Sequence, residues 1–208
     1  MIVVDIESSG IFIEKCGIWQ IGAVDLETGK EFLEDSRIDD EDIIVKEACI
    51  VTGRSEEEMR DKNKQSQKQL LENFFKWCKE ISADYIIGHN VQFDIMFLQI
   101  KAREYGLKIP YSYRAFDLHT IAQVRYFQIK DIFVIKEDEK LGLPDIIDFV
   151  GLEDERIQLK DGEVVKEGKP HNALEDARLE AECFSRLIFG KNFIEDYKKF
   201  EIPGYLKK

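Results

Sequence analysis

Two acidic side chains near the start of the chain have the spacing of a metal site. Asp5 and Glu7 stand at the end of a mainly apolar run, residues 2–6, and strand residues two apart project from the same face. Two carboxylates on one rigid edge can hold a hard cation such as Mg²⁺. Ser8-Ser9-Gly10 follows, a small turn whose backbone amides can approach a ligand closely. The same acidic spacing lacks this context at three other places and is interpreted there as solvent-facing: Asp25/Glu27, Asp39/Glu41 and Asp161/Glu163.

A second polar group, His89-Asn90-Val91-Gln92-Phe93-Asp94, lies where a predicted strand at residues 85–88 gives way to a predicted helix at 91–105. Asn90 is expected to be the helix N-cap. Asp94 then falls in the first turn, where the helix dipole favours an anion. Helix stabilisation and catalysis therefore explain Asp94 equally well.

A third group, His171-Asn172-Ala173-Leu174-Glu175-Asp176, opens a predicted helix at residues 173–189. Asp176 is expected in its opening turns, with His171 on the preceding loop. Imidazole titrates near neutral pH, so a histidine here could act as a general base. Spacing alone leaves two candidates, because His89 also stands five residues before an aspartate. His119 has no such partner pattern, and we assign it no role.

The elements that must position these groups follow from periodicity and turn residues. Apolar runs at 2–6, 18–26 and 31–38, joined by short turns, predict an antiparallel meander. A short helix is expected at 56–60 and a long amphipathic one at 70–81. Strands at 85–88 and 113–117 alternate with helices at 91–105 and from 118 onward, which implies parallel pairing and a mixed sheet. A short helix at 144–150 and a hairpin at 157–166, turning at Asp161-Gly162, complete the set. The sequence does not decide whether this hairpin borders a groove or covers a sheet edge.

Size and composition fit one globular domain of 208 residues, with 44% hydrophobic and 35% charged residues. A net charge of −12 argues against a protein held on nucleic acid mainly by phosphate neutralisation, unless bound cations supply the positive charge. No apolar run is long enough to span a bilayer, and the N-terminus lacks the pattern of a signal peptide. We therefore expect a cytoplasmic protein without membrane contact, whose cysteines are reduced, buried thiols: Cys16, Cys49, Cys78 and Cys183.

The three polar groups, in this order and at these intervals, resemble the exonuclease motifs of the DEDDh (DnaQ-like) 3′→5′ exonucleases, a family of the ribonuclease-H-like superfamily. The run Trp19-Gln20-Ile21-Gly22-Ala23-Val24 is similar to that family's second strand. The resemblance covers roughly residues 2–189. It implies an α/β fold with a ribonuclease-H-like mixed five-stranded sheet flanked by helices. We expect an exonuclease domain at 1–190 and a basic, aromatic tail at 191–208, packed on that domain or extending from it.

The resemblance also implies a mechanism and a set of site residues. Asp5, Glu7 and Asp176 would hold one metal ion, Asp5 would bridge to a second, and Asp94 would support that second ion. Two Mg²⁺ ions, for which Mn²⁺ would substitute, can stabilise the attacking and leaving oxygens of a phosphodiester displacement. His171 is placed as the general base. The implied substrate contacts are Ser8, Ser9, Ile11 and Asn90, although Ile11 and its neighbour Phe12 could equally close the core.

The implied activity is the removal of 5′-mononucleotides from single-stranded 3′ ends, as in DNA repair or proofreading or in RNA trimming. The choice between DNA and RNA is not encoded in these motifs, because it depends on contacts to the sugar 2′ position. Two alternatives remain. One is a proofreading-type subunit that works with a polymerase or with a second copy of itself, and the other is a catalytically silent nucleic-acid-binding module on the same fold.

Overall fold

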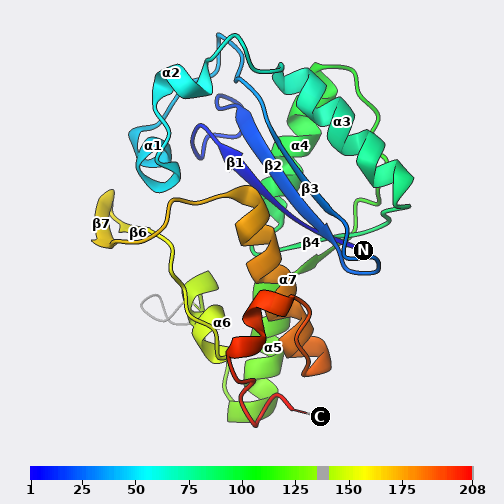
Figure 1. Ribbon diagram of the computed structural model, residues 1–208, viewed down its shortest axis with the longest axis vertical. Helices are drawn as coiled ribbons and strands as arrows, with labels where there is room; N and C mark the ends of the chain where they lie inside the picture. The colour runs from blue at the N-terminus through cyan, green and yellow to red at the C-terminus, as the bar shows by residue number, and fades with distance from the viewer. Residues whose placement is uncertain (135–140, 208) are drawn as a thin grey trace.

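A computed structural model describes residues 1–134 and 141–207 of the chain, and its centre is a five-stranded sheet of order β3-β2-β1-β4-β5 (Figure 1). Strands β1 (Ile2–Ser8), β2 (Ile18–Asp25) and β3 (Glu31–Asp35) form the predicted antiparallel meander. Strand β4 (Ile86–Gly88) pairs with β1 in parallel, and β5 (Ala115–Asp117) pairs with β4 in parallel. The mixed five-stranded sheet predicted from the sequence is therefore confirmed.

The two faces of the sheet bury different helices, and the alternation along β1 decides which face carries the acids. Ile2, Val4 and Ile6 belong to the core shared with α3 (Gln67–Glu80) and α4 (Gln92–Glu104). Val3 belongs to the opposite core. That core contains residues of α5 (Leu118–Lys130), α6 (Leu143–Phe149) and α7 (Ala173–Phe189). Because strand side chains alternate, Asp5 and Glu7 share the face of Val3 and project toward α7.

Helix α7 begins directly over β2, and Gly22 makes this approach possible. A Cβ atom at Gly22 would lie 2.1 Å from the carbonyl carbon of Ala173 and 2.2 Å from the nitrogen of Leu174. Gly22 is also the register partner of Asp5 on β1. The missing side chain therefore lets the first turn of α7 lie beside the acidic end of β1.

Several elements differ from the sequence-based expectation. Strand β3 ends at Asp35, and pairing with β2 stops after the N–H of Ser36, which still donates to the carbonyl of Trp19. The N–H of Arg37 then donates to Gln65 and that of Ile38 to Met59. The polar stretch after it contains the expected α2 (Glu56–Met59) and also α1 (Lys46–Thr52), which was not predicted. Among the cysteines, Cys49 is only half-buried, whereas the other three are buried, and all four are free thiols.

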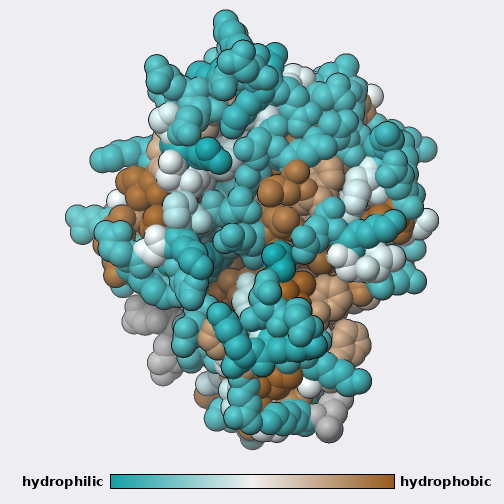
Figure 2. All heavy atoms as spheres, in the orientation of Figure 1, coloured by the Kyte–Doolittle hydropathy of each residue, from teal (hydrophilic) through white to brown (hydrophobic). Residues whose placement is uncertain are grey.

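The predicted hairpin is present as β6 (Gln158–Lys160) and β7 (Glu163–Lys166). Asp161 and Gly162 have φ of 53° and 80°, the left-handed pair that a tight two-residue turn requires. The hairpin is a separate two-stranded sheet, so it does not extend the main one. Figure 2 shows hydrophobic atoms where Figure 1 places β7, whose Val164 and Val165 are exposed, on a face that is otherwise mainly hydrophilic.

The segment after α7 folds back on the helix through a buried ion pair. Arg186 and Glu182 lie 2.8 Å apart with no solvent exposure. The guanidinium also donates to the carbonyls of Tyr197 and Phe200, near the 3₁₀ turn η1 (Glu195–Lys199). Of the basic tail residues, Lys208 lies outside the described part. None of the helices described here combines the length and apolarity needed to cross a bilayer.

We predict that Gly22→Ala lowers the free energy of unfolding by roughly 1–3 kcal/mol, the usual cost of overpacking, because the added methyl group meets the backbone of α7. Denaturant unfolding monitored by circular dichroism measures this change. Gly204→Ala is the matched control, since nothing lies within 4 Å of a Cβ atom there. Equal stability of the Gly22→Ala variant and the wild type would show that α7 has room to move away from β2.

Candidate active site

Three acidic side chains gather where β1 runs beyond the end of β4. Strand β4 pairs with β1 only at Ile2 and Val3, so the later part of β1 faces the loop between β4 and α4. Asp94, in the first turn of α4, accepts a hydrogen bond of 3.0 Å from the N–H of Ile6. Ile6 lies between Asp5 and Glu7, so this bond holds the Asp94 carboxylate against the acidic end of the strand.

Asn90 does not cap α4 as expected. The residue before the helix is Val91, which has no side-chain cap, and Asn90 instead adopts a left-handed conformation with φ of 52°. Asparagine tolerates this conformation better than most residues, which suits it to the sharp turn between β4 and α4. The N–H of Val91 is satisfied from elsewhere, because it donates to Asp117 at 3.2 Å. The Asn90 side chain is exposed.

The start of α7 supplies the remaining residues of the third motif. Asn172 caps the helix by accepting from the N–H groups of Leu174 and Glu175, and Asp176 lies one turn in. Gln20 on β2 accepts the N–H of Ala173 at 2.8 Å. The N–H of His171 donates to the carbonyl of Val51 at the end of α1. The helix start is thus held by β2, and His171 by α1.

Glu7, His171 and Asp176 meet closely enough to hold a cation together. One ligand atom from each lies within 4.8 Å of the other two. One carboxylate oxygen of Glu7 is buried and has no hydrogen-bond partner among the described residues. Buried polar atoms nearly always have a partner, so this oxygen indicates a ligand that binds here. The carboxylate oxygens suit a hard divalent cation such as Mg²⁺, whereas imidazole is a less typical ligand for such an ion.

Burial raises the pKa values of these acids, and nearby carboxylates add to the effect at Asp5 and Glu7. Burial and the charge of Asp176 raise the pKa of Glu7 to about 8. Burial raises the pKa of Asp94 to about 7, although the hydrogen bond from Ile6 opposes the shift. Asp5 keeps some solvent contact, yet desolvation and the surrounding carboxylates raise its pKa well above the usual range. A nearby cation would reverse these shifts because it stabilises the ionised form.

His171 and His89 occupy different environments. The Nε2 of His171 lies 2.9 Å from the carbonyl of Ile157, which can only accept, so Nε2 carries the proton. Its Nδ1 faces Asp176 at 3.4 Å. Burial lowers the pKa of His171, but the hydrogen bond and charge of Asp176 outweigh this and raise it. Burial lowers the pKa of His89 to about 4, and its ring packs 6.1 Å from that of His119.

Sequence reasoning missed three polar residues at this site. Gln20 is buried in β2 and ties it to α7. Glu180, one turn after Asp176 on α7, is buried and accepts the N–H of His89 at 3.0 Å. An acid four residues after Asp176 on an amphipathic helix was a signal that could have been used. Arg156 contacts Asp176 at 3.2 Å from the segment before β6, and no local pattern marks it.

The predicted substrate contacts at the β1–β2 loop differ in availability. Ser9 is fully buried, and its hydroxyl donates to the carbonyl of Ile43 and accepts the N–H of Gly17, so it anchors the loop rather than offering a free hydroxyl. Ser8 is half-buried and donates to the carbonyl of Gly10. Ile11 and Phe12 are 71% and 52% exposed, so the alternative that they close the core is wrong.

Several solved structures that are similar to this chain are nucleases. E. coli exonuclease I in complex with a 5cy-dT13 oligonucleotide matches with a TM-score of 0.64 and 16% identity over 94% of this chain. The nuclease domain of 3′hExo, a DEDDh family member bound to rAMP, matches with a TM-score of 0.61 and 15% identity over 97% of this chain and 94% of its own. A 3′-exonuclease with a histone mRNA stem-loop matches with a TM-score of 0.65 and 15% identity over 97% of this chain and 65% of its own. The predicted ribonuclease-H-like fold is confirmed.

The chain spans only 42% of exonuclease I. No curated protein matches it in sequence. The profile of the 3′-5′ exoribonuclease Rv2179c-like domain matches residues 1–188, nearly all of the chain. This match confirms the predicted class, a hydrolytic 3′→5′ exonuclease domain, and the chain belongs to the Rv2179c-like 3′-5′ exoribonuclease domain family.

Proposed function

We propose that this chain removes 5′-mononucleotides from single-stranded 3′ ends, with RNA as its preferred substrate, and that two divalent cations support the reaction. The observation that carries the proposal is the convergence of Glu7, His171 and Asp176 within 4.8 Å beside Asp5 and Asp94. The preference for RNA is supported by the exoribonuclease family to which the domain belongs.

The proposed cation ligands fit a site for Mg²⁺, for which Mn²⁺ substitutes. Asp5, Glu7 and Asp176 would hold one ion, and Asp5 and Asp94 would hold the other. The unpaired oxygen of Glu7 and the raised pKa values of Glu7 and Asp94 support this assignment. Cations bound there would neutralise the carboxylates and stabilise the charge that develops on the attacking and leaving oxygens.

His171 is the proposed general base, acting at Nδ1. The carbonyl of Ile157 fixes the proton on Nε2, which leaves the Nδ1 lone pair directed toward the acidic site. The imidazole can then accept a proton from the attacking water at Nδ1, while the carbonyl of Ile157 stabilises the imidazolium that forms. His89 is a poorer candidate, because it lies outside the cluster of Glu7, His171 and Asp176 and burial disfavours its protonation.

The terminal nucleotide is proposed to bind over the β1–β2 loop. Ile11, which is 71% exposed, would pack against a base, and Ser8 and the exposed Asn90 would contact the sugar-phosphate end. Gly10 has φ of 157°, and a Cβ atom there would lie 2.4 Å from a Val45 methyl group. The loop is therefore packed against Val45 at Gly10, and this support for the residue before Ile11 favours the proposed role of Ile11.

We predict that the purified chain digests labelled RNA from a free 3′ hydroxyl, requires Mg²⁺ or Mn²⁺, and stalls on a blocked 3′ end. Matched DNA and RNA oligonucleotides, with and without a 3′ block, measure polarity and preference together. Asp5→Asn should be inactive and folded, because it removes a proposed ligand and relieves repulsion. Cleavage in excess chelator, or equal rates on circular and linear strands, would contradict the proposal.

We predict that His171→Ala lowers kcat by roughly 10²- to 10⁴-fold, the usual scale for loss of a general base. The acid limb of the pH–rate profile should disappear with it. His119→Ala is the matched control, because the His119 ring contacts His89 and Gln123 rather than the carboxylates, and should leave kcat nearly unchanged. If His89→Ala loses the acid limb and His171→Ala keeps it, His89 is the base and the proposed role of His171 is wrong.

We predict that the metal-free protein loses stability as pH rises from about 4 to about 8. The folded-state pKa values of Glu7 (about 8) and Asp94 (about 7) exceed those of unfolded carboxyl groups, so the folded state binds more protons in this window. Thermal unfolding with chelator should give a higher Tm at pH 5.5 than at pH 8. Added Mg²⁺ should raise the Tm more at pH 8, and Asp5→Asn should reduce the pH dependence. A metal-free Tm that rises with pH would refute this account.

A further inference from the structure

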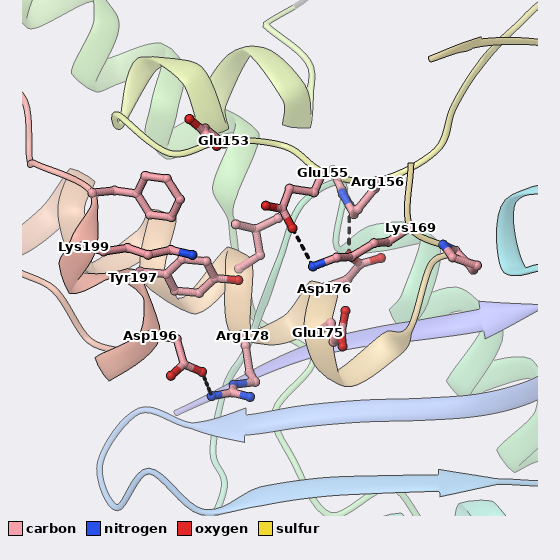
Figure 3. Close-up of a pocket in the computed structure, with 13 residues that line it drawn as sticks. Glu153, Glu155, Arg156, Lys169, Glu175, Asp176, Arg178, Asp196, Tyr197 and Lys199 are labelled. Atoms are coloured by element: carbon pink, nitrogen blue, oxygen red, sulfur yellow. Dashed lines mark hydrogen bonds and ion pairs between the residues drawn. The ribbon is translucent and has the colours of Figure 1, made fainter. Parts of the chain in front are cut away.

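One arginine reaches into the acidic site from the segment between α6 and β6. An Nη1–H of Arg156 donates to Asp176 Oδ1 at 3.2 Å, and its side chain is only 14% exposed. Figure 3 shows this contact from the pocket that Arg156 and Asp176 both line. Arginine keeps its charge at any physiological pH. A permanent positive charge is therefore in contact with Asp176, one of the proposed metal ligands.

The guanidinium of Arg156 is held in this place by Asp154. Its Nε and Nη2 groups donate to the two oxygens of Asp154 at 2.9 and 3.0 Å, a bidentate pair in which Asp154 is 6% exposed. The backbone N–H of Arg156 donates to the same carboxylate. Such a two-pronged contact fixes the plane of the guanidinium as well as its position. Arg156 thus reaches Asp176 with little freedom to turn away.

The same segment also holds the proposed base. The N–H of Ile157 donates to the carbonyl of Lys169 at 3.0 Å, and the carbonyl of Ile157 accepts the Nε2–H of His171. Gly168 permits this close pairing, because a Cβ atom there would lie 2.3 Å from the carbonyl oxygen of Glu155. Residues 154–157 therefore orient the carboxylate of Asp176 and the imidazole of His171 together.

Arg156 lies between the carboxylates of the acidic site and a pocket that is also lined by Lys169, Arg178 and Lys199. Burial raises the pKa of both Glu7 and Glu180, and the charge of Arg156 opposes part of this rise. The carboxylates that repel one another at this site include one outside the predicted motifs: Asp5, Glu7, Asp94, Asp176 and Glu180. A single fixed cation relieves part of this repulsion, and it does so at an oxygen that a metal ion would also attract.

We propose that Arg156 is a resident cation of this site, a positioning residue that holds Asp176 when metal is absent and competes with metal for that carboxylate. The inference rests on the proposed metal-dependent function. It predicts a change in metal affinity opposite in direction to the change that an ordinary structural role would give. Damage to an ordinary structural contact beside a metal site weakens metal binding, commonly 10- to 100-fold. Removal of a competing positive charge strengthens it.

The test is a calorimetric titration with Mn²⁺ alone, without nucleic acid. Arg156→Gln should bind Mn²⁺ roughly tenfold or more tightly than the wild type, since a like charge beside the ion has been removed. Arg156→Lys keeps the charge and should stay within about threefold of the wild type. Arg178→Gln is the matched control, because Arg178 lies on α7 but pairs with Glu31 and Asp196, and its affinity should not change.

Thermal unfolding with chelator and with saturating Mn²⁺ checks the fold of each variant. Arg156→Gln should lose Tm mainly without metal, so that Mn²⁺ raises its Tm more than that of the wild type. Asp154→Asn/Arg156→Gln, which leaves no unpaired carboxylate at residue 154 and retains polar amides, covers the case in which Arg156→Gln does not fold, and its affinity should shift the same way. Unchanged or weaker Mn²⁺ binding in the folded variant overturns the inference. Absence of Mn²⁺ binding in the wild type would instead refute the proposed function.

Discussion

Repulsion between crowded carboxylates sets the conditions under which this site can exist. Burial raises the pKa values of Asp5, Glu7, Asp94 and Glu180, and the charges of neighbouring carboxylates raise those of Asp5, Glu7 and Glu180 further. The protein offsets part of this cost with backbone N–H donors from Ile6 and His89. Arg156 offsets more of it at Asp176. One buried oxygen of Glu7 still has no hydrogen-bond partner among the described residues, and a bound cation would supply one.

The fold imposes this crowding by bringing rigid element ends together. Two acids leave the same face of β1, the third enters in the first turn of α4, and the last enters in the first turns of α7. The contacts of α4 and α7 with the sheet prevent these acids from moving apart. Asp94 is bonded to the backbone of β1, and α7 lies directly on the backbone of β2 at Gly22. Rigid supports of this kind keep ligands in place at the distances that metal-assisted chemistry requires.

The parts of the structure that follow local rules could be predicted from the sequence. Helix α7 was expected at residues 173–189 and begins and ends there, because Asn172 caps it and Gly190 terminates it in a left-handed conformation. The hairpin turn at Asp161-Gly162 was equally local. Periodicity also placed Asp5 and Glu7 on one face. It could not identify the helix they face, which became clear only from the two cores on either side of β1.

The parts that depend on distant partners could not be predicted. Arg156 and Gln20 act through contacts with α7 from 20 and 153 residues away in sequence, and neither belongs to a local pattern. Asn90 was predicted to cap α4 from its position, but it adopts a left-handed conformation in the turn before the helix instead. Helix α1 was missed because its seven residues are too few to show a helical period and include three β-branched side chains, Ile50, Val51 and Thr52, which lower helix propensity.

We propose that these carboxylates hold two cations beside His171. A crystal structure of the chain grown with Mn²⁺ and a 5′-mononucleotide tests it most directly, because anomalous scattering locates manganese independently of any assumed mechanism. The account predicts two manganese peaks, one bounded by Asp5, Glu7 and Asp176 and the other by Asp5 and Asp94, with the phosphate between them and His171 facing it. Manganese peaks elsewhere on the surface, with these carboxylates free of metal, would contradict the account.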